Sequence, residues 1–126
     1  MPVIDNSRLK IFTLPGIVHQ TLAGPKHGLK TLEVWRQTMA PGAATPTHRH
    51  NCEEVFVILR GSGRVTIQGR DFDFGANTTL IVPPDVVHQV VNTGTEELSF
   101  VVVLGMAPVE ATTPDGEAIP LPWRAG

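Results

Sequence analysis

The sequence has no tyrosine and only one cysteine, and both shortages limit what the protein can do. Without a phenol side chain, no mechanism that passes a proton through tyrosine is open to it. Cys52 alone cannot form a disulfide within the chain, which is typical of a protein in a reducing compartment. The N-terminal residues are charged early and lack the apolar stretch of a secretory signal, so we expect a cytoplasmic protein.

Basic runs and long apolar runs are also missing. Ten Lys and Arg side chains against twelve Asp and Glu give a net charge of −2, without a basic cluster. Such a chain is not suited to nucleic acids or to anionic membranes. No apolar run approaches the roughly 18 residues of a membrane-spanning helix. At 126 residues and 41% hydrophobic content, the chain is predicted to form one domain, residues 1–126.

Glycine and proline, in contrast, are abundant at 12 and 11 residues, and they separate short apolar segments. This spacing predicts short strands joined by turns, and no sustained 3.6-residue period indicates a long helix. The predicted strands are 16–22, 29–39, 54–59, 63–68, 71–74, 79–82, 86–92 and 98–104. Antiparallel strands of this kind predict an all-β sandwich or jelly-roll barrel over residues 16–105. An N-terminal arm (1–15) and a proline-rich wrapping tail (106–126), anchored by Trp123, complete the prediction.

Two histidines lie close together in a stretch that we expect to be extended. His48 and His50 are two residues apart, so both imidazoles point to the same face. Glu54 shares their parity and Glu53 does not, although an irregular turn would reverse this, so geometry alone leaves both glutamates open. His88 lies on another predicted strand. Three imidazoles and one carboxylate that converge would bind one divalent transition metal: zinc, iron, manganese, nickel or copper.

These stretches resemble the two sequence motifs of the cupins. The first motif is matched at every position: Gly42, five residues, His48-x-His50, three residues, Glu54, six residues and Gly61. The second motif is matched in its later half, Pro83-x-Asp85-x-x-His88-x-x-x-Asn92, and Gly75 supplies its leading glycine. Gly75 lies two residues further upstream than is usual, and Asp85 stands where glycine is more common. The resemblance implies the cupin jelly-roll fold and selects Glu54, with the three histidines, as the metal ligands.

A narrower resemblance, to the plant auxin-binding proteins, covers residues 28–100. It is carried by LEVWRQT at 32–38, TPTHRHNCEEVF at 45–56, NTT at 77–79, and His88-Gln89 with Asn92. In that family three histidines and one glutamate hold zinc, and the carboxylate of an aryl acetate meets the ion. The resemblance implies zinc as the favoured metal here. It also implies a ligand pocket lined by Trp35, Gln37, Thr45 and Pro46 and closed from the tail by Trp123.

The chain departs from the plant proteins, which enter the secretory pathway and carry a disulfide. With one cysteine and no signal sequence, it is expected to be a cytoplasmic, bacterial relative. An apolar outer sheet face and open strand edges predict a homodimer. We expect Cys52 to be a small buried hydrophobe, Arg49 to face solvent or a second chain, and His19 and His27 to lie on the surface.

The predicted site has one property that bears directly on function. A divalent ion with neutral imidazoles and one carboxylate keeps a charge of about +1, which favours an anion in an apolar barrel. The chain is therefore predicted to hold a small organic carboxylate, aromatic by resemblance, at the metal. The alternative is a metal-dependent enzyme acting on a small organic acid or enol. It would be a dioxygenase or a Lewis-acid cyclase, isomerase or decarboxylase, with Glu54 as the possible base.

Overall fold

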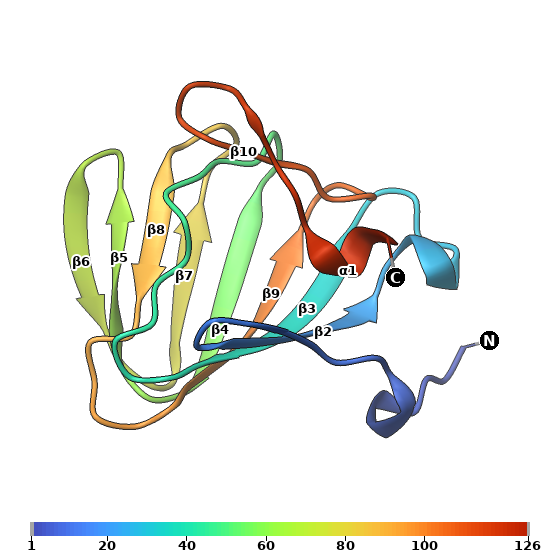
Figure 1. Cartoon of the computed structure of the whole chain (residues 1–126), viewed down its shortest axis with the longest axis horizontal. Coiled ribbons are helices and arrows are strands. Elements are labelled where there is room, and N and C mark those ends of the chain that lie inside the picture. Colours follow the sequence, from blue (N-terminus) through green and yellow to red (C-terminus); the bar gives the residue numbers. More distant parts are fainter. Residues whose placement is uncertain (1, 126) are drawn as a thin grey trace.

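The computed structural model describes residues 2–125 and consists almost entirely of antiparallel strands in two main sheets (Figure 1). The larger sheet has the order β1 (Phe12–Leu14), β2 (Ile17–Ala23), β3 (Glu33–Met39), β9 (Leu98–Leu104), β4 (Glu54–Arg60) and β7 (Thr78–Val82). The smaller sheet has the order β6 (Arg70–Phe74), β5 (Gly63–Ile67) and β8 (His88–Val91). This confirms the predicted all-β jelly-roll class, although in residues 2–125 no strand pairing closes the sheets into a continuous barrel.

A further segment, residues 44–49, extends the smaller sheet next to β8. Single bridges pair Ala44 with Val91 and His48 with His88. The backbone amide of His48 donates to the carbonyl of His88 at 3.0 Å, and the reverse bond measures 2.8 Å. Pro46 has no amide hydrogen, so a continuous ladder cannot form here. The segment nevertheless brings His48 alongside His88.

The core lies between the sheets and follows from side-chain alternation. Along β3 the residues alternate between buried and partly exposed from Glu33 to Met39. In β9 the inward side chains include Leu98, Phe100 and Leu104, all at 0% exposure. Alternation of this kind is expected where one face of a strand meets the core and the other meets solvent.

The outer face of the larger sheet is also apolar. Cross-strand pairing aligns Val34 with Val103, Val103 with Val55, and Val55 with Ile81. A valine or isoleucine therefore occupies each position of a row that crosses β3, β9, β4 and β7. Ile81 is 69% exposed and Val103 36% exposed, so the row is open to solvent in the single chain.

The turn between β4 and β5 shows why the first motif ends in glycine. Gly61 has a φ of +87°, which side-chain-bearing residues rarely adopt. A Cβ atom there would also lie 2.7 Å from the carbonyl oxygen of Glu97. Only glycine satisfies both constraints, and this turn sets where β4 ends.

The structure revises the predicted boundaries at several places. The predicted arm contains β1, which pairs with β2, and the strand predicted at 29–39 begins only at Glu33.

The tail contains β10 (Ala111–Thr112), β11 (Ala118–Ile119) and the short helix α1 (Pro122–Ala125). Two 3-10 turns, η1 (Asn6–Arg8) and η2 (Pro25–His27), complete the elements. Figure 1 shows the tail crossing in front of the sheets, and α1 packs against β2. None of the described helices is long and apolar enough to cross a membrane.

Phe100 gives a direct test of the core. We expect Phe100→Ala to lower the free energy of unfolding by about 3–5 kcal/mol, because the lost side chain is fully buried and leaves a cavity. Urea denaturation measures this change. Phe72→Ala is the matched control, since Phe72 is 45% exposed on β6 and should cost much less. Equal losses from both variants would contradict the assignment of the core.

Candidate metal centre and its pocket

The four predicted ligands come from three parts of the chain that meet between the sheets. His48 and His50 lie on the segment before β4, Glu54 begins β4, and His88 begins β8. One ring nitrogen from each histidine lies within 4.8 Å of the others. An oxygen of Glu54 lies 2.9 Å from Nε2 of His88, and its other oxygen lies 3.8 Å from Nε2 of His50. His50, Glu54 and His88 are buried, and His48 is partly exposed.

Each imidazole is oriented by a backbone carbonyl. The Nδ1 atoms of His48, His50 and His88 lie 2.6, 2.7 and 2.9 Å from the carbonyl oxygens of Pro46, Glu110 and Val86. A carbonyl only accepts, so each Nδ1 must donate its hydrogen. In the neutral rings every Nε2 therefore keeps a free lone pair. Metal-binding histidines in proteins are held in this way.

The atoms that face the centre have no hydrogen-bond partners of their own. This holds for Nε2 of His50, Nε2 of His88 and Oε1 of Glu54, all buried among the described residues. Oε1 of Glu54 and Nε2 of His88 lie 2.9 Å apart, but when the hydrogen of the neutral His88 ring is on Nδ1, neither of these two atoms is a donor. Buried polar atoms without partners are costly. A cation bound to these atoms would satisfy all of them, so the residues present fit a divalent transition metal.

Burial and neighbouring charges shift the pKa values of two histidines in this cluster, His48 and His88. Burial, with the neighbouring His88 and His50, lowers the pKa of His48 to about 4, so its imidazole stays neutral at physiological pH. Burial also lowers the pKa of His88, but the carboxylate of Glu54 outweighs this and the net pKa is raised. The carboxylate of Glu54 therefore favours a positive charge next to it.

The two residues that precede Glu54, Cys52 and Glu53, are not part of the candidate ligand set. Glu53 is exposed, whereas Glu54 is 3% exposed and faces inward, as the parity predicted. Cys52 lies in the hydrophobic core. Burial, followed by the charge of Glu54, raises the pKa of its thiol to about 11. The thiol therefore stays protonated at neutral pH, and Cys52 behaves as the expected small hydrophobe.

Two residues of the second motif shape the turns around β8. Asp85 has a φ of +60°, which explains why glycine is common there and why aspartate is tolerated. Its backbone amide donates to the carbonyl of His50 at 2.8 Å. Asn92 is 1% exposed and its amide donates to the carbonyl of Met39 at 2.8 Å. These bonds connect β8 to the ligand-bearing segment and to β3.

A small cavity of about 70 Å³ opens next to the candidate metal centre. Trp35, Gln37, Thr45, Pro46 and Trp123, the five residues predicted from the resemblance, all lie on its walls. Apart from these and His48, His50 and Glu54, its walls are apolar: Leu14, Ile17, Phe56, Val102, Ala111, Ile119 and Leu121. Outside the ligand candidates, the polar side-chain groups on the described walls of this metal-facing cavity are the amide of Gln37, the hydroxyl of Thr45 and the indole N–H groups of Trp35 and Trp123.

The prediction that His19 lies on the surface is wrong. Its side chain is fully buried, because β2 pairs with β3 so that His19 lies opposite Gln37 on the inward face. The two side chains are 2.9 Å apart, and the other ring nitrogen of His19 lies 2.8 Å from the hydroxyl of Thr21. Burial lowers the pKa of His19 to about 3, so the ring is neutral. His19 lies two residues after Ile17 on the same strand, so both side chains face the same side. The apolar Ile17 was therefore the sequence signal that His19 is buried.

His19 also packs the aromatic walls of the cavity. Its ring stacks on Trp123 with centroids 3.7 Å apart and meets Trp35 edge-on at 5.0 Å. Gln37, Trp35 and Trp123 therefore all depend on this histidine for their positions. His27, in contrast, is exposed on η2 as predicted. Arg49 is partly buried and its Nε donates to the hydroxyl of Thr112 in the tail.

The antiparallel jelly roll and the histidines that meet inside it define a cupin. Solved structures of this class share the fold. An RmlC-like cupin from Shewanella frigidimarina is 19% identical with a TM-score of 0.74, covering 86% of this chain and 93% of that one. The polyketide cyclase RemF from Streptomyces resistomycificus is 21% identical with a TM-score of 0.74, covering 96% and 87%.

Within this class, the chain belongs to the auxin-binding protein family, whose sequence model, described as Auxin binding protein, matches residues 3–121. Auxin-binding protein 1 of Arabidopsis thaliana is 44% identical over 106 residues, which are 76% of this chain and 54% of that protein. The chain thus spans about half the length of this relative. The predicted similarity to the plant auxin-binding proteins is confirmed.

The candidate ligands can be tested by metal content. We expect His48→Ala or His88→Ala to lower the bound metal by about tenfold or more in elemental analysis of purified protein, because each change removes one of four donor atoms. His27→Ala is the control, since this exposed histidine lies on η2, away from the centre, and should leave the metal content unchanged. Unchanged stoichiometry in the His48 and His88 variants would contradict the four-ligand site.

Proposed function

We propose that the chain is a metal-dependent binding protein for a small organic carboxylate. His48, His50, Glu54 and His88 would hold one divalent transition metal, with zinc favoured by family membership. The bound ion supplies a Lewis-acid centre for an anionic oxygen. The observation that carries the proposal is the convergence of unpartnered Nε2 and carboxylate atoms beside an otherwise apolar cavity. A few polar anchors in an apolar wall are typical of small-molecule sites.

The metal-facing cavity favours binding over catalysis. Among the described residues that line it, the only titratable side chains are His48, His50 and Glu54. Each of these is committed to the metal in the proposed site, so no independent acid or base faces the ligand. Proton-transfer chemistry normally requires such a group within hydrogen-bond reach. In the alternative, a metal-dependent enzyme, Glu54 would have to leave the ion to act as the base.

The size of the cavity restricts the ligand. At about 70 Å³ it is well below the roughly 300 Å³ or more of typical small-molecule sites. Trp123 lies on the tail and separates this cavity from a larger one, which it also lines. We propose that an aromatic acid is admitted when the indole of Trp123 shifts away from the centre.

Tryptophan fluorescence tests the carboxylate proposal, because Trp35 and Trp123 are the only tryptophans and both line the cavity. Phenylacetate should change the emission of the metal-loaded protein in a saturable way, and chelation should weaken its binding by at least about tenfold. Phenylacetamide, of nearly the same shape but uncharged, is the matched control, and chelation should leave its affinity unchanged. A phenylacetate affinity that is equal before and after chelation would rule out a contact between metal and carboxylate.

We also propose that two chains pair through the outer face of the larger sheet. The row formed by Val34, Val103, Val55 and Ile81 exposes adjacent apolar side chains, and Val57, at 41% exposure, continues the patch. Contiguous apolar surface of this kind typically marks a contact between proteins. Pairing of the two faces would cover this surface and would leave the metal-facing cavity, between the sheets, accessible.

Light scattering tests the dimer. The wild-type chain should have a mass near twice 13.6 kDa at micromolar concentration. The double change Val57→Lys and Val103→Lys should give the single-chain mass, because charged side chains would be buried unpaired in the interface. Phe72→Lys, a similar change on exposed β6 of the other sheet, should remain dimeric. A wild-type monomer, or a dimer that tolerates the double change, would reject this interface.

A further inference from the structure

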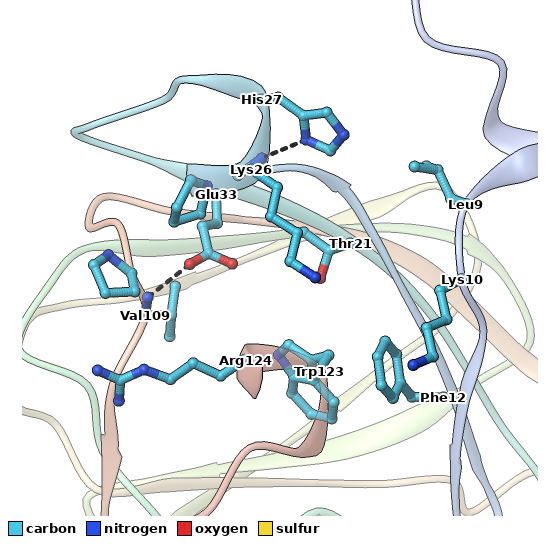
Figure 2. A pocket seen from close by; sticks show the side chains of 13 residues that line it. Leu9, Lys10, Phe12, Thr21, Lys26, His27, Glu33, Val109, Trp123 and Arg124 are labelled. Atoms are coloured by element: carbon cyan, nitrogen blue, oxygen red, sulfur yellow. Dashed lines mark hydrogen bonds between the residues drawn. The ribbon is translucent and has the colours of Figure 1, made fainter. Parts of the chain in front are cut away.

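Among the described residues, a second cavity is larger than the one beside the metal centre. It encloses about 290 Å³, against about 70 Å³ for the metal-facing cavity. Residues from the N-terminal arm, from η2 and its flanks, and from the tail form its walls (Figure 2). We call it the outer cavity. Its volume is close to the lower limit of about 300 Å³ for small-molecule sites.

The walls of the outer cavity offer an apolar and aromatic surface. Leu9, Phe12, Pro108, Val109 and Trp123 all line it. Phe12 and Trp123 both pack on the buried ring of His19, at centroid distances of 6.4 and 3.7 Å. Aromatic side chains held by such packing form a firm surface for a flat apolar molecule.

The charged groups around this surface are mainly positive. Lys10, Lys26 and Arg124 line the outer cavity, and Glu33 is the one acidic side chain on its walls. Arg124 lies 3.3 Å from the carboxylate of exposed Glu110. Within residues 2–125, the ion pairs shorter than 4.0 Å involve neither lysine. The ammonium of Lys10 lies 5.0 Å from the ring centre of Phe12, and Figure 2 shows Lys26 extending over the cavity toward Thr21.

The one acidic group does not neutralise these lysines directly. Glu33 is 5% exposed, and one of its oxygens accepts from the indole nitrogen of Trp35 at 2.9 Å. Its other oxygen accepts from the backbone amide of Val109 at 2.7 Å, as Figure 2 shows. Both oxygens are therefore occupied by donors of the protein. Lys10 and Lys26 remain available to an anion that enters the cavity.

From the apolar walls and the two free lysines, we infer that the outer cavity is a second binding site, for an organic anion with an aromatic body. The ring system would lie against Phe12 and Trp123, and the anionic group would face Lys10 and Lys26. This site uses none of the four metal-ligand candidates. It therefore goes beyond the proposed function and stands whether or not the carboxylate proposal holds.

Titration with 1-anilinonaphthalene-8-sulfonate tests the site, because this aromatic sulfonate becomes fluorescent in apolar surroundings. We expect saturable binding of equal affinity to metal-loaded and chelated protein. The double change Lys10→Glu and Lys26→Glu should weaken binding by about tenfold or more, since it replaces attraction by repulsion. Lys30→Glu, the same change at an exposed lysine outside the cavity walls, should leave the affinity within about twofold of wild type.

Two further controls separate this site from others on the protein. His48→Ala should leave sulfonate binding unchanged, whereas it should reduce bound metal. N-phenyl-1-naphthylamine, which lacks the sulfonate, should bind with an affinity that is insensitive to the lysine changes and to salt. Sulfonate binding that is equal in the double lysine variant, or that disappears on chelation, would overturn the inference. Because Lys10 and Lys26 are exposed, the variant should keep the wild-type unfolding midpoint.

Discussion

Three hydrogen bonds from imidazole Nδ1 atoms to backbone carbonyls hold the candidate metal centre in its geometry. Each bond selects the tautomer and the orientation of one ring, so the three Nε2 lone pairs converge beside Glu54. The carbonyls of Pro46 and Val86 lie two residues before the histidines that they orient, and the jelly roll brings the carbonyl of Glu110 next to His50. The arrangement leaves buried donor atoms without partners, and a divalent cation is the chemical species that satisfies them together.

The space around this centre is divided by Trp123. Trp123 lines both the small metal-facing cavity and the larger outer cavity. His19 fixes the position of Trp123 by stacking and holds Gln37 by a hydrogen bond, so a single buried histidine organises the walls of both cavities. Trp35 lines the metal-facing cavity and Glu33 lines the outer cavity, and a hydrogen bond between their side chains connects the two walls.

Much of this structure was predictable from local patterns. The eight predicted strands correspond to β2–β9, because turn residues bound each of them and alternation defines each inward face. The parity of His48, His50 and Glu54 placed all three on the inward side. Errors occurred where tertiary contacts outweighed the pattern. The N-terminal arm forms β1 because β2 offers it an open edge, and His19 is buried because register places it opposite Gln37.

The sequence by itself determined the fold class, the family and the set of residues able to bind a metal, because spacing along a strand dictates which side chains share a face. Only the tertiary structure decided the tautomer of His50, the size of the metal-facing cavity and the existence of the outer cavity. Each of these depends on groups far apart in the chain, such as His50 with the carbonyl of Glu110 and Glu33 with the amide of Val109. No local pattern encodes these contacts, since they form only when the tail packs against the sheets.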